Sequence, residues 1–200
     1  MRKLPTKEIP NACRMLAESF AEYGAYRAIL DEKHFDNGIY WLFRYELHVS
    51  SDYNYTDGDT DVVVALKRPG DKDKSDVTFF ANPFRAAGFL SAVGRRGISV
   101  AREYVAMTEE TAAKFYNPDT DCYLKNIGVK KSARGKGLLR KALSELCGDM
   151  PIYLETHTEE NVAIYRRLGF EVCAEVPFYG FTHYAMKRDG VYVGGNALDR

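Results

Sequence analysis

The sequence predicts an α/β fold in which helices flank a mixed sheet. Between residues 122 and 168, strand-like and helix-like apolar patterns alternate in the order strand, helix, strand, helix. That order implies neighbouring parallel strands joined by a crossover helix. Residues 53–66 and 172–187 each contain two strand-like runs joined by a turn, which predicts antiparallel hairpins. A sheet that combines parallel and antiparallel pairing follows.

Length and composition are typical of one soluble domain. The chain has 200 residues, of which 46% are hydrophobic and 28% are charged. We expect one domain over residues 1–188, followed by a glycine-rich tail or an added strand over 189–200. Lys plus Arg equals Asp plus Glu at 28 each, so no overall field draws the chain to nucleic acid or to an anionic membrane. The sequence shows neither a long apolar run nor a signal-peptide pattern, so we expect a cytoplasmic protein.

The N-terminal part predicts two amphipathic helices. The first runs from Ile9 to Phe20, because its apolar residues recur at helical spacing, and residues 23–26 break it. The second runs from about Asn37 to Val49. It carries aromatic residues that could line a substrate pocket, although their spacing favours a core-facing helix: Tyr40, Trp41, Tyr45 and His48.

The middle of the chain predicts a hairpin and then a helical region. Strands at residues 53–55 and 62–66 are joined by an Asp- and Gly-rich turn. Residues 82–116 have helical periodicity that three glycines interrupt, which predicts two or three helices with breaks at Gly88, Gly94 and Gly97.

The last third has the clearest patterns. Strands are expected at residues 122–129 and 152–156, each followed by a helix, the second of which starts after the N-cap Thr158 and stops before Gly169. A terminal hairpin pairs residues 172–177 with 181–187. The widely spaced cysteines predict reduced core thiols rather than a zinc or redox site: Cys13, Cys122, Cys147 and Cys173.

A basic segment, KKSARGKGLLRK at residues 130–141, lies between the strand at 122–129 and the following helix. A helix that begins directly after a strand presents unpaired backbone N–H groups and the positive end of its dipole. Gly135 and Gly137 would let an anion approach the backbone, while Arg134, Lys136 and Arg140 add positive charge. The segment therefore predicts a site for a ligand with several phosphates.

Other phosphate and nucleic-acid motifs fit this segment poorly. Position 130 is lysine and Gly137 follows Lys136, so the P-loop pattern fails. Arg140 stands where a Rossmann fingerprint needs its third glycine. A nucleic-acid patch would extend further, yet the next helix opens with two glutamates. Some of these charges are expected to be solvated helix ends, but solvation alone does not explain the glycines.

Two motifs resemble the GNAT superfamily of N-acetyltransferases. Residues 134–139, RGKGLL, are similar to the R/Q-x-x-G-x-G/A signature and follow a strand that ends in Ile-Gly-Val. Residues 161–170, NVAIYRRLGF, are similar to the N-x-x-x-Y-x-x-x-G-F element of the family. The resemblance is firm over residues 122–188 and includes a likeness to puromycin N-acetyltransferase and its relatives. Leu139 departs from the pattern, since the family has Gly or Ala there. This change is harmless if Leu139 faces the core, but it would displace the cofactor if the side chain faces the pyrophosphate.

The resemblance implies a GNAT fold, acetyl-CoA as cosubstrate and no metal. It implies that Asn161 holds the cofactor arm and that Tyr165 donates a proton or hydrogen bond to the CoA sulfur. The two residues are four apart and share one side of their helix. Alternatively, Tyr165 packs in the core. The remaining residues expected to bind the cofactor are Ile127, Gly128, Val129, Arg134, Gly135, Lys136, Gly137 and Leu138.

The general base is less clearly indicated. Glu155, at the end of its strand, is the candidate for catalysis, with a solvated or ion-paired strand end as the alternative. Further candidates are less specific, and a water relay would serve without any of them: Glu22, Glu32, His157 and His183.

Together these features predict an N-acetyltransferase that transfers an acetyl group from acetyl-CoA to a primary amine of a small molecule, by direct attack in a ternary complex. One alternative is a catalytically silent acyl-CoA-binding or sensing protein of the same fold. Another is a protein-interaction module in which the basic loop is only surface charge. We expect a small-molecule partner, without nucleic acid or membrane, and a homodimer stays open.

Overall fold

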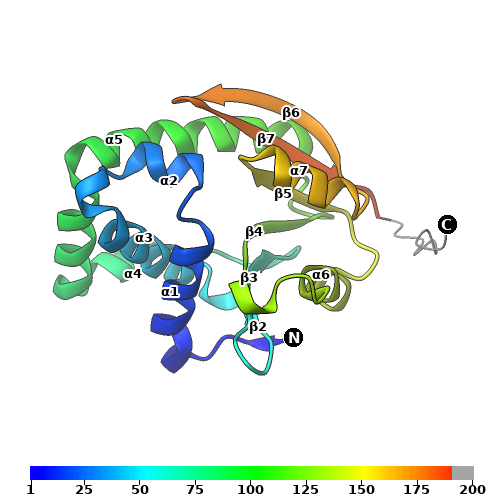
Figure 1. Cartoon of the computed structure of the whole chain (residues 1–200), viewed down its shortest axis with the longest axis horizontal. Coiled ribbons are helices and arrows are strands. Elements are labelled where there is room, and N and C mark those ends of the chain that lie inside the picture. The colour runs from blue at the N-terminus through cyan, green and yellow to red at the C-terminus, as the bar shows by residue number, and fades with distance from the viewer. Residues whose placement is uncertain (191–200) are drawn as a thin grey trace.

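A computed structural model describes residues 1–190, in which seven strands form one sheet in the order β1-β2-β3-β4-β5-β7-β6 (Figure 1). Most of the expected tail or added strand, from residue 191 on, lies outside the described residues. The strands are β1 (Arg2–Lys3), β2 (Asn54–Thr56), β3 (Val62–Lys67), β4 (Cys122–Val129), β5 (Ile152–Thr156), β6 (Glu171–Phe178) and β7 (Phe181–Arg188).

The pairing confirms the predicted mixed sheet. The central strands β4 and β5 are parallel, and every other neighbouring pair is antiparallel. Both predicted hairpins form, β2 with β3 and β6 with β7. The short strand β1 was not expected, because two residues are too few for a periodic pattern.

Helices cover both faces of the sheet. The α-helices are α1 (Ile9–Ser19), α2 (Gly24–Ile29), α3 (Phe35–Val49), α4 (Val77–Phe80), α5 (Pro83–Phe115), α6 (Leu138–Cys147) and α7 (Glu159–Arg166). Short 3-10 turns are η1 (Thr6–Glu8), η2 (Glu32–His34), η3 (Ser51–Tyr53) and η4 (Lys131–Ala133). In residues 1–190, no helix combines the length and the apolar character that a membrane span requires.

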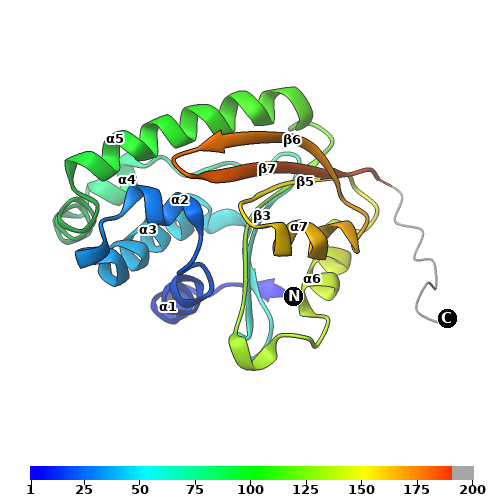
Figure 2. The ribbon, with the colours of Figure 1, turned by 45° about the horizontal axis from the view of Figure 1, so that its top comes forward.

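The side chains of β3 show how the two faces are separated. Val62 and Val64 belong to the core beneath α6 and α7, whereas Val63 belongs to the core formed with α1, α3 and α5. Alternation along a strand sends successive side chains to opposite faces. Figure 2 shows α5 and α7 on opposite sides of the β6–β7 hairpin. We call the side of the sheet that carries Val62 and Val64 the α6–α7 face, and the side that carries Val63 the α1–α3–α5 face.

The expected helix breaks are partly wrong. Of the three glycines in residues 82–116, only Gly94 leaves the helical conformation, with φ 67° and ψ 173°. Gly88 stays helical and packs against α3, where a Cβ would meet the Trp41 ring at 2.2 Å. Residues 23–26 do not simply end the first helix either, since α2 begins at Gly24 and packs closely against Phe181.

The aromatic residues of α3 also differ from expectation. The buried stripe of α3 contains Ile39, Leu42, Phe43 and Leu47, while the four aromatics highlighted by the sequence are only half-buried. Tyr45 packs its ring against residues of α4 and α5 rather than against the sheet. These aromatics therefore join α3 to its neighbouring helices. All four cysteines are free thiols, and Cys173 alone among them is half-exposed.

Candidate active site

The sheet divides between its two central strands. Parallel pairing between β4 and β5 covers three residue pairs, the last of which is Leu124↔Leu154. Beyond that pair β4 continues along β3, whereas β5 continues along β7 (Figure 1). The β3–β4 ladder also shifts register between residues 65 and 66, beside the point of divergence. We call the diverging parts, residues 125–129 of β4 and 155–156 of β5, the fork.

The loop from β4 to α6 ends in two glycines with left-handed backbone. Gly135 has φ 78°, and Gly137, the N-cap of α6, has φ 71°. No heavy atom lies within 4 Å of a Cβ built at either position, so backbone conformation rather than space requires glycine. No side chain caps the N-terminus of α6. An anion placed there would meet open N–H groups and the positive end of the helix dipole.

Side chains of this loop divide between solvent and core. Arg134 and Lys136 are exposed, and the Nε of Arg134 donates a hydrogen bond of 3.3 Å to the carbonyl oxygen of Val129. Leu138 and Leu139 pack against the core beneath α6. The core-facing alternative for Leu139 therefore holds, and its departure from the family signature leaves the loop open.

The fork half of β4 is sandwiched between the two faces. Ile127 and Val129 pack toward the α6–α7 face. Gly128 faces α1 so closely that a Cβ would lie 2.6 Å from Cδ2 of Leu16. The strand arm that would carry the cofactor is thus fixed by packing on both sides.

Helix α7 brings Asn161 and Tyr165 to the fork from the α6–α7 face. The hydroxyl oxygen of Thr158 accepts a hydrogen bond from the backbone N–H of Asn161, as the N-cap prediction requires. The Tyr165 ring is buried in the core that also contains Leu154, and it makes an edge contact with Phe170. Burial raises the pKa of Tyr165, and the nearby Tyr23 adds to this effect, so the phenol stays protonated.

Tyr23, in the connection between α1 and α2, reaches into the fork. Its hydroxyl lies 2.7 Å from Oγ1 of Thr156, and its ring stacks near His157 at 4.3 Å between centroids. Burial raises the pKa of Tyr23 to about 12, against the lowering effect of hydrogen bonds that include one with Asn161. Sequence reasoning treated Tyr23 only as part of a helix break, and no local pattern connects it to Thr156.

Glu46 of α3 lies at the other side of the fork. Its carboxylate accepts hydrogen bonds from Nδ2 of Asn126 at 2.7 Å and from the hydroxyl of Tyr26 at 3.1 Å. Burial raises the pKa of Glu46 to about 7, although both hydrogen bonds and the charge of Lys125 act in the opposite direction. Three elements that are distant in sequence, α2, α3 and β4, thus converge on one carboxylate.

Sequence reasoning missed Glu46, although a signal was present. Glu46 follows Ile39, Leu42 and Phe43 by seven, four and three residues, so it continues the buried stripe of α3. An acidic residue in such a stripe is seldom buried without partners. That observation could have marked Glu46 as a functional candidate.

Glu155 lies on the α1–α3–α5 face, because alternation along β5 places it with Tyr153 rather than with Leu154. The hydroxyls of Tyr123 and Tyr153 donate to its carboxylate at 2.8 and 2.9 Å. Nε2 of His183 lies 3.7 Å from one of its oxygens. The structure therefore does not bring Glu155 and Tyr165 to the same face of the sheet, and the role of Glu155 as a base stays a prediction.

The two histidines of the sequence prediction are both buried and in contact with each other. Nδ1 of His183 lies 3.4 Å from Nε2 of His157, and the hydroxyl of Tyr104 lies 2.8 Å from the same nitrogen. The N–H of Ala25 donates to Nδ1 of His157 at 3.4 Å. Burial, together with the charge of His183, lowers the pKa of His157 to about 3, so this imidazole is neutral at physiological pH.

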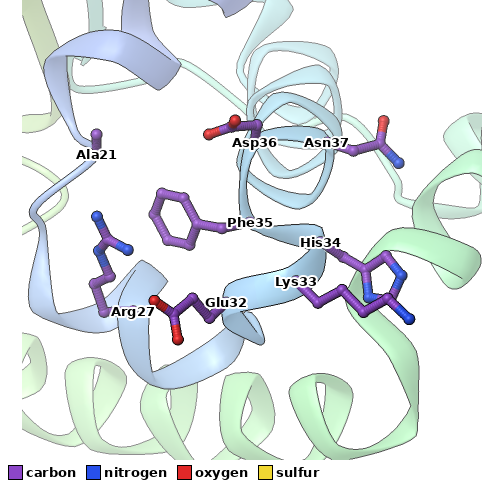
Figure 3. Close-up of a pocket in the computed structure, with 8 residues that line it drawn as sticks. All are labelled: Ala21, Arg27, Glu32, Lys33, His34, Phe35, Asp36 and Asn37. Atoms are coloured by element: carbon purple, nitrogen blue, oxygen red, sulfur yellow. The ribbon is translucent and has the colours of Figure 1, made fainter.

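A hollow of about 370 Å³ lies elsewhere on the surface (Figure 3). It is lined by Arg27 of α2, by the turn η2 and by the start of α3, where the Arg27 guanidinium stacks 4.0 Å from the Phe35 ring centroid. Of the remaining catalytic candidates named from the sequence, only Glu32 lines it. Since no residue of β4, β5, α6 or α7 takes part, the hollow is separate from the fork.

No family model matches the chain. An uncharacterised protein of Mycobacterium leprae (strain TN) is 29% identical over 150 residues, which cover 64% of this chain and 41% of that protein. The chain thus spans about two fifths of the length of this curated relative.

Solved structures, two of them described as acetyltransferases, share the architecture. A structure from Corynebacterium glutamicum ATCC 13032, described as histone acetyltransferase HPA2 and related acetyltransferase, matches with a TM-score of 0.58 at 21% identity over 94% of both chains. An N-acetyltransferase from Staphylococcus aureus Mu50 has a TM-score of 0.51 at 11% identity, over 93% of this chain and 98% of that one. The C-terminal condensation domain of Ebony, in complex with beta-alanyl-dopamine, has a TM-score of 0.59 at 7% identity, over 92% and 95%. The chain therefore has the fold of the GNAT acetyltransferases, which confirms the fold that the two sequence motifs predicted.

Proposed function

We propose that this protein is an N-acetyltransferase that moves an acetyl group from acetyl-CoA to a primary amine of a small molecule. The fork between β4 and β5, with the uncapped N-terminus of α6 beside one arm, is the observation that carries this proposal. Coenzyme A joins a diphosphate to an amide-containing arm that ends in a thiol. The helix N-terminus suits the diphosphate, and an unpaired strand edge suits the amides.

The residues present fit such a ligand. The left-handed glycines Gly135 and Gly137 leave the space in front of the α6 N-terminus open, while Arg134 and Lys136 supply positive charge. The edge of β4 over residues 125–129 forms no described strand pairs with β5, so its backbone N–H groups could polarise a thioester carbonyl. Holding the thioester and amine together at the fork would supply much of the rate acceleration.

Tyr165 is the proposed donor to the sulfur that leaves. A phenol whose pKa is raised by burial stays protonated, so its hydroxyl can donate to the negative charge that develops on the departing sulfur. Asn161, one helical turn earlier, is proposed to hold the arm of the cofactor.

Titration calorimetry with CoA tests the cofactor site. We expect binding by the wild type, and an affinity weaker by about tenfold or more when Arg134 and Lys136 are both changed to alanine, because each can make charge-assisted hydrogen bonds to phosphate. Lys131→Ala is the matched control, since Lys131 is exposed in the same loop but precedes the glycines. Absence of binding heat in the wild type would refute the proposed cofactor.

An amine panel, scored by release of free thiol from acetyl-CoA, tests the reaction. We expect turnover with at least one primary amine, and Tyr165→Phe should lower kcat far more than it weakens CoA binding. Unchanged turnover in that variant would rule out the donor role. CoA binding without turnover on any amine would favour the acyl-CoA sensing alternative.

A further inference from the structure

We infer that the carboxylate of Glu46 is the general base that takes a proton from the acceptor amine at the α1–α3–α5 face of the fork. This inference rests on the proposed acetyl transfer, for which the sequence alone indicated no specific base other than Glu155. Glu46 would act on the amine nitrogen directly or through one water molecule.

The position of Glu46 follows from its hydrogen bond to β4. Asn126 is the second residue of β4 beyond its last pair with β5, and its side chain donates to Glu46 at 2.7 Å. The carboxylate therefore lies beside the strand arm whose N–H groups are proposed to hold the thioester. Tyr165 approaches from the opposite face, through the core that contains Leu154. An amine that attacks the thioester between β4 and β5 would thus have the proton acceptor Glu46 on the α1–α3–α5 face and the sulfur donor Tyr165 on the α6–α7 face.

The hydrogen bonding of Glu46 leaves it able to accept a proton. A carboxylate offers about four lone-pair directions, and Asn126 and Tyr26 occupy two of them. Tyr26 remains a donor because burial, with Glu46 next in effect, keeps the pKa of its phenol well above the ordinary value. Tyr26 and Asn126 are therefore positioning residues, which hold the carboxylate without neutralising it.

The charged and titratable groups around Glu46 are compatible with this role. Lys125 of β4 contributes the nearby positive charge, and its effect is smaller than those of burial and of the two hydrogen bonds. Cys13 of α1 and Tyr104 of α5 also feel the Glu46 charge, but burial raises the pKa of both, to about 12 for Cys13, so both stay neutral. A base with a pKa near 7 is half ionised at neutral pH and still strong enough to deprotonate an ammonium in a transition state.

The other candidates at this face are less suited. His157 has a pKa of about 3 and its ring nitrogens contact Ala25, Tyr104 and His183, so it is a weak base that already has partners. Glu155 accepts from two donors, as Glu46 does, but it also lies 3.7 Å from the fully buried His183 and its side chain is only 12% exposed. Asp73 also bonds to the fork arm of β4, through Lys125 at 3.2 Å, but that pair is an ion pair in which Lys125 lowers the pKa of Asp73. Glu46 instead accepts from the neutral amide of Asn126 at 2.7 Å.

The proton balance of the reaction closes with these groups. The ammonium nitrogen gives one proton to Glu46, and the lone pair so freed forms the C–N bond to the acetyl carbon. The C–S bond breaks with its electrons going to sulfur, which takes a proton from Tyr165. The nitrogen loses its second proton, which returns through water to Tyr165. Glu46 then releases its proton to solvent, so the products are the amide, free thiol and one proton.

The pH dependence of kcat/KM tests the inference, with an amine found in the panel. In the wild type we expect a limb that rises with pH near 7, separate from the deprotonation of an ordinary alkyl amine near pH 10. Glu46→Gln should remove the limb near 7 and lower kcat by about 100-fold or more, while CoA affinity is retained. Tyr26→Phe should move the limb to higher pH, because its hydrogen bond lowers the pKa of Glu46. A purely structural role for Tyr26 would leave the limb in place.

Two comparisons make the outcome decisive. Glu18→Gln removes an exposed carboxylate from α1 and should keep both the limb and kcat. If Glu155→Gln removes the limb and Glu46→Gln retains it, the inference is overturned while the acetyltransferase proposal survives. If the wild type neither binds CoA nor acetylates any amine, the proposed function fails and the inference fails with it.

Discussion

Changing Glu46 to glutamine should alter how the stability of the protein depends on pH. This prediction concerns folding and is independent of catalysis. Burial raises the pKa of this carboxyl from 4.5 to about 7 in the folded state. Below pH 4.5 the carboxyl is protonated in both the folded and unfolded chains. Between pH 4.5 and 7 the unfolded chain ionises while the folded one keeps its proton, so the free energy of unfolding falls as pH rises. Above pH 7 the whole cost of ionising a buried carboxylate is present.

The size of the effect follows from the shift. A rise of the pKa from 4.5 to about 7 corresponds to about 3 kcal/mol, which is an upper limit. The hydrogen bonds from Asn126 and Tyr26 and the charge of Lys125 already act against burial within this value. Glutamine keeps the shape and can still accept from Asn126 and donate to the oxygen of Tyr26.

Urea unfolding at a series of pH values from 4 to 8 measures this directly. Relative to the wild type, Glu46→Gln should gain up to about 3 kcal/mol of stability between pH 4 and pH 8. Glu18→Gln, which makes the same change of charge on the exposed side of α1, is the matched control. A stability difference between Glu46→Gln and wild type that stays constant across this range would refute the buried-carboxylate reasoning, and with it the pH limb expected for catalysis.

Two glycines provide further predictions. Gly88→Ala should lower the free energy of unfolding by about 1–3 kcal/mol, because its Cβ would collide with the Trp41 ring at 2.2 Å. Gly58→Ala, with open space around the added Cβ, is the control. Equal urea midpoints for Gly88→Ala and the wild type would contradict the close packing of α3 and α5. Gly137→Ala should cost about 1 kcal/mol through its left-handed φ of 71° and should also weaken CoA binding in the calorimeter. Full CoA affinity in Gly137→Ala would show that the conformation of this loop does not govern the cofactor site.

Much of the architecture follows from local sequence patterns. The helix from Ile9, the β2–β3 and β6–β7 hairpins and the strand–helix alternation after residue 122 all depend on periodicity and turn residues within a few positions of each other. The loop with Gly135 and Gly137 could be predicted for the same reason, since its conformation is set by the residues themselves. Thr158 likewise caps α7 through a contact three residues away.

Long-range packing decided the remainder. Both Gly88 and Gly94 are glycines within α5, yet Gly88 is helical and packs against Trp41, whereas Gly94 breaks the helix. The fork exists because residues 126–129 of β4 pair only with β3, while residues 155–156 of β5 pair with β7. Strand pairing depends on contacts between residues that are distant in sequence, so local patterns do not predict it. Glu46 meets Asn126 across 80 positions of sequence, which no local periodicity reports. Local patterns therefore indicated the loop that is proposed to bind CoA, whereas only the tertiary structure brought Glu46 of α3 to Asn126 of β4.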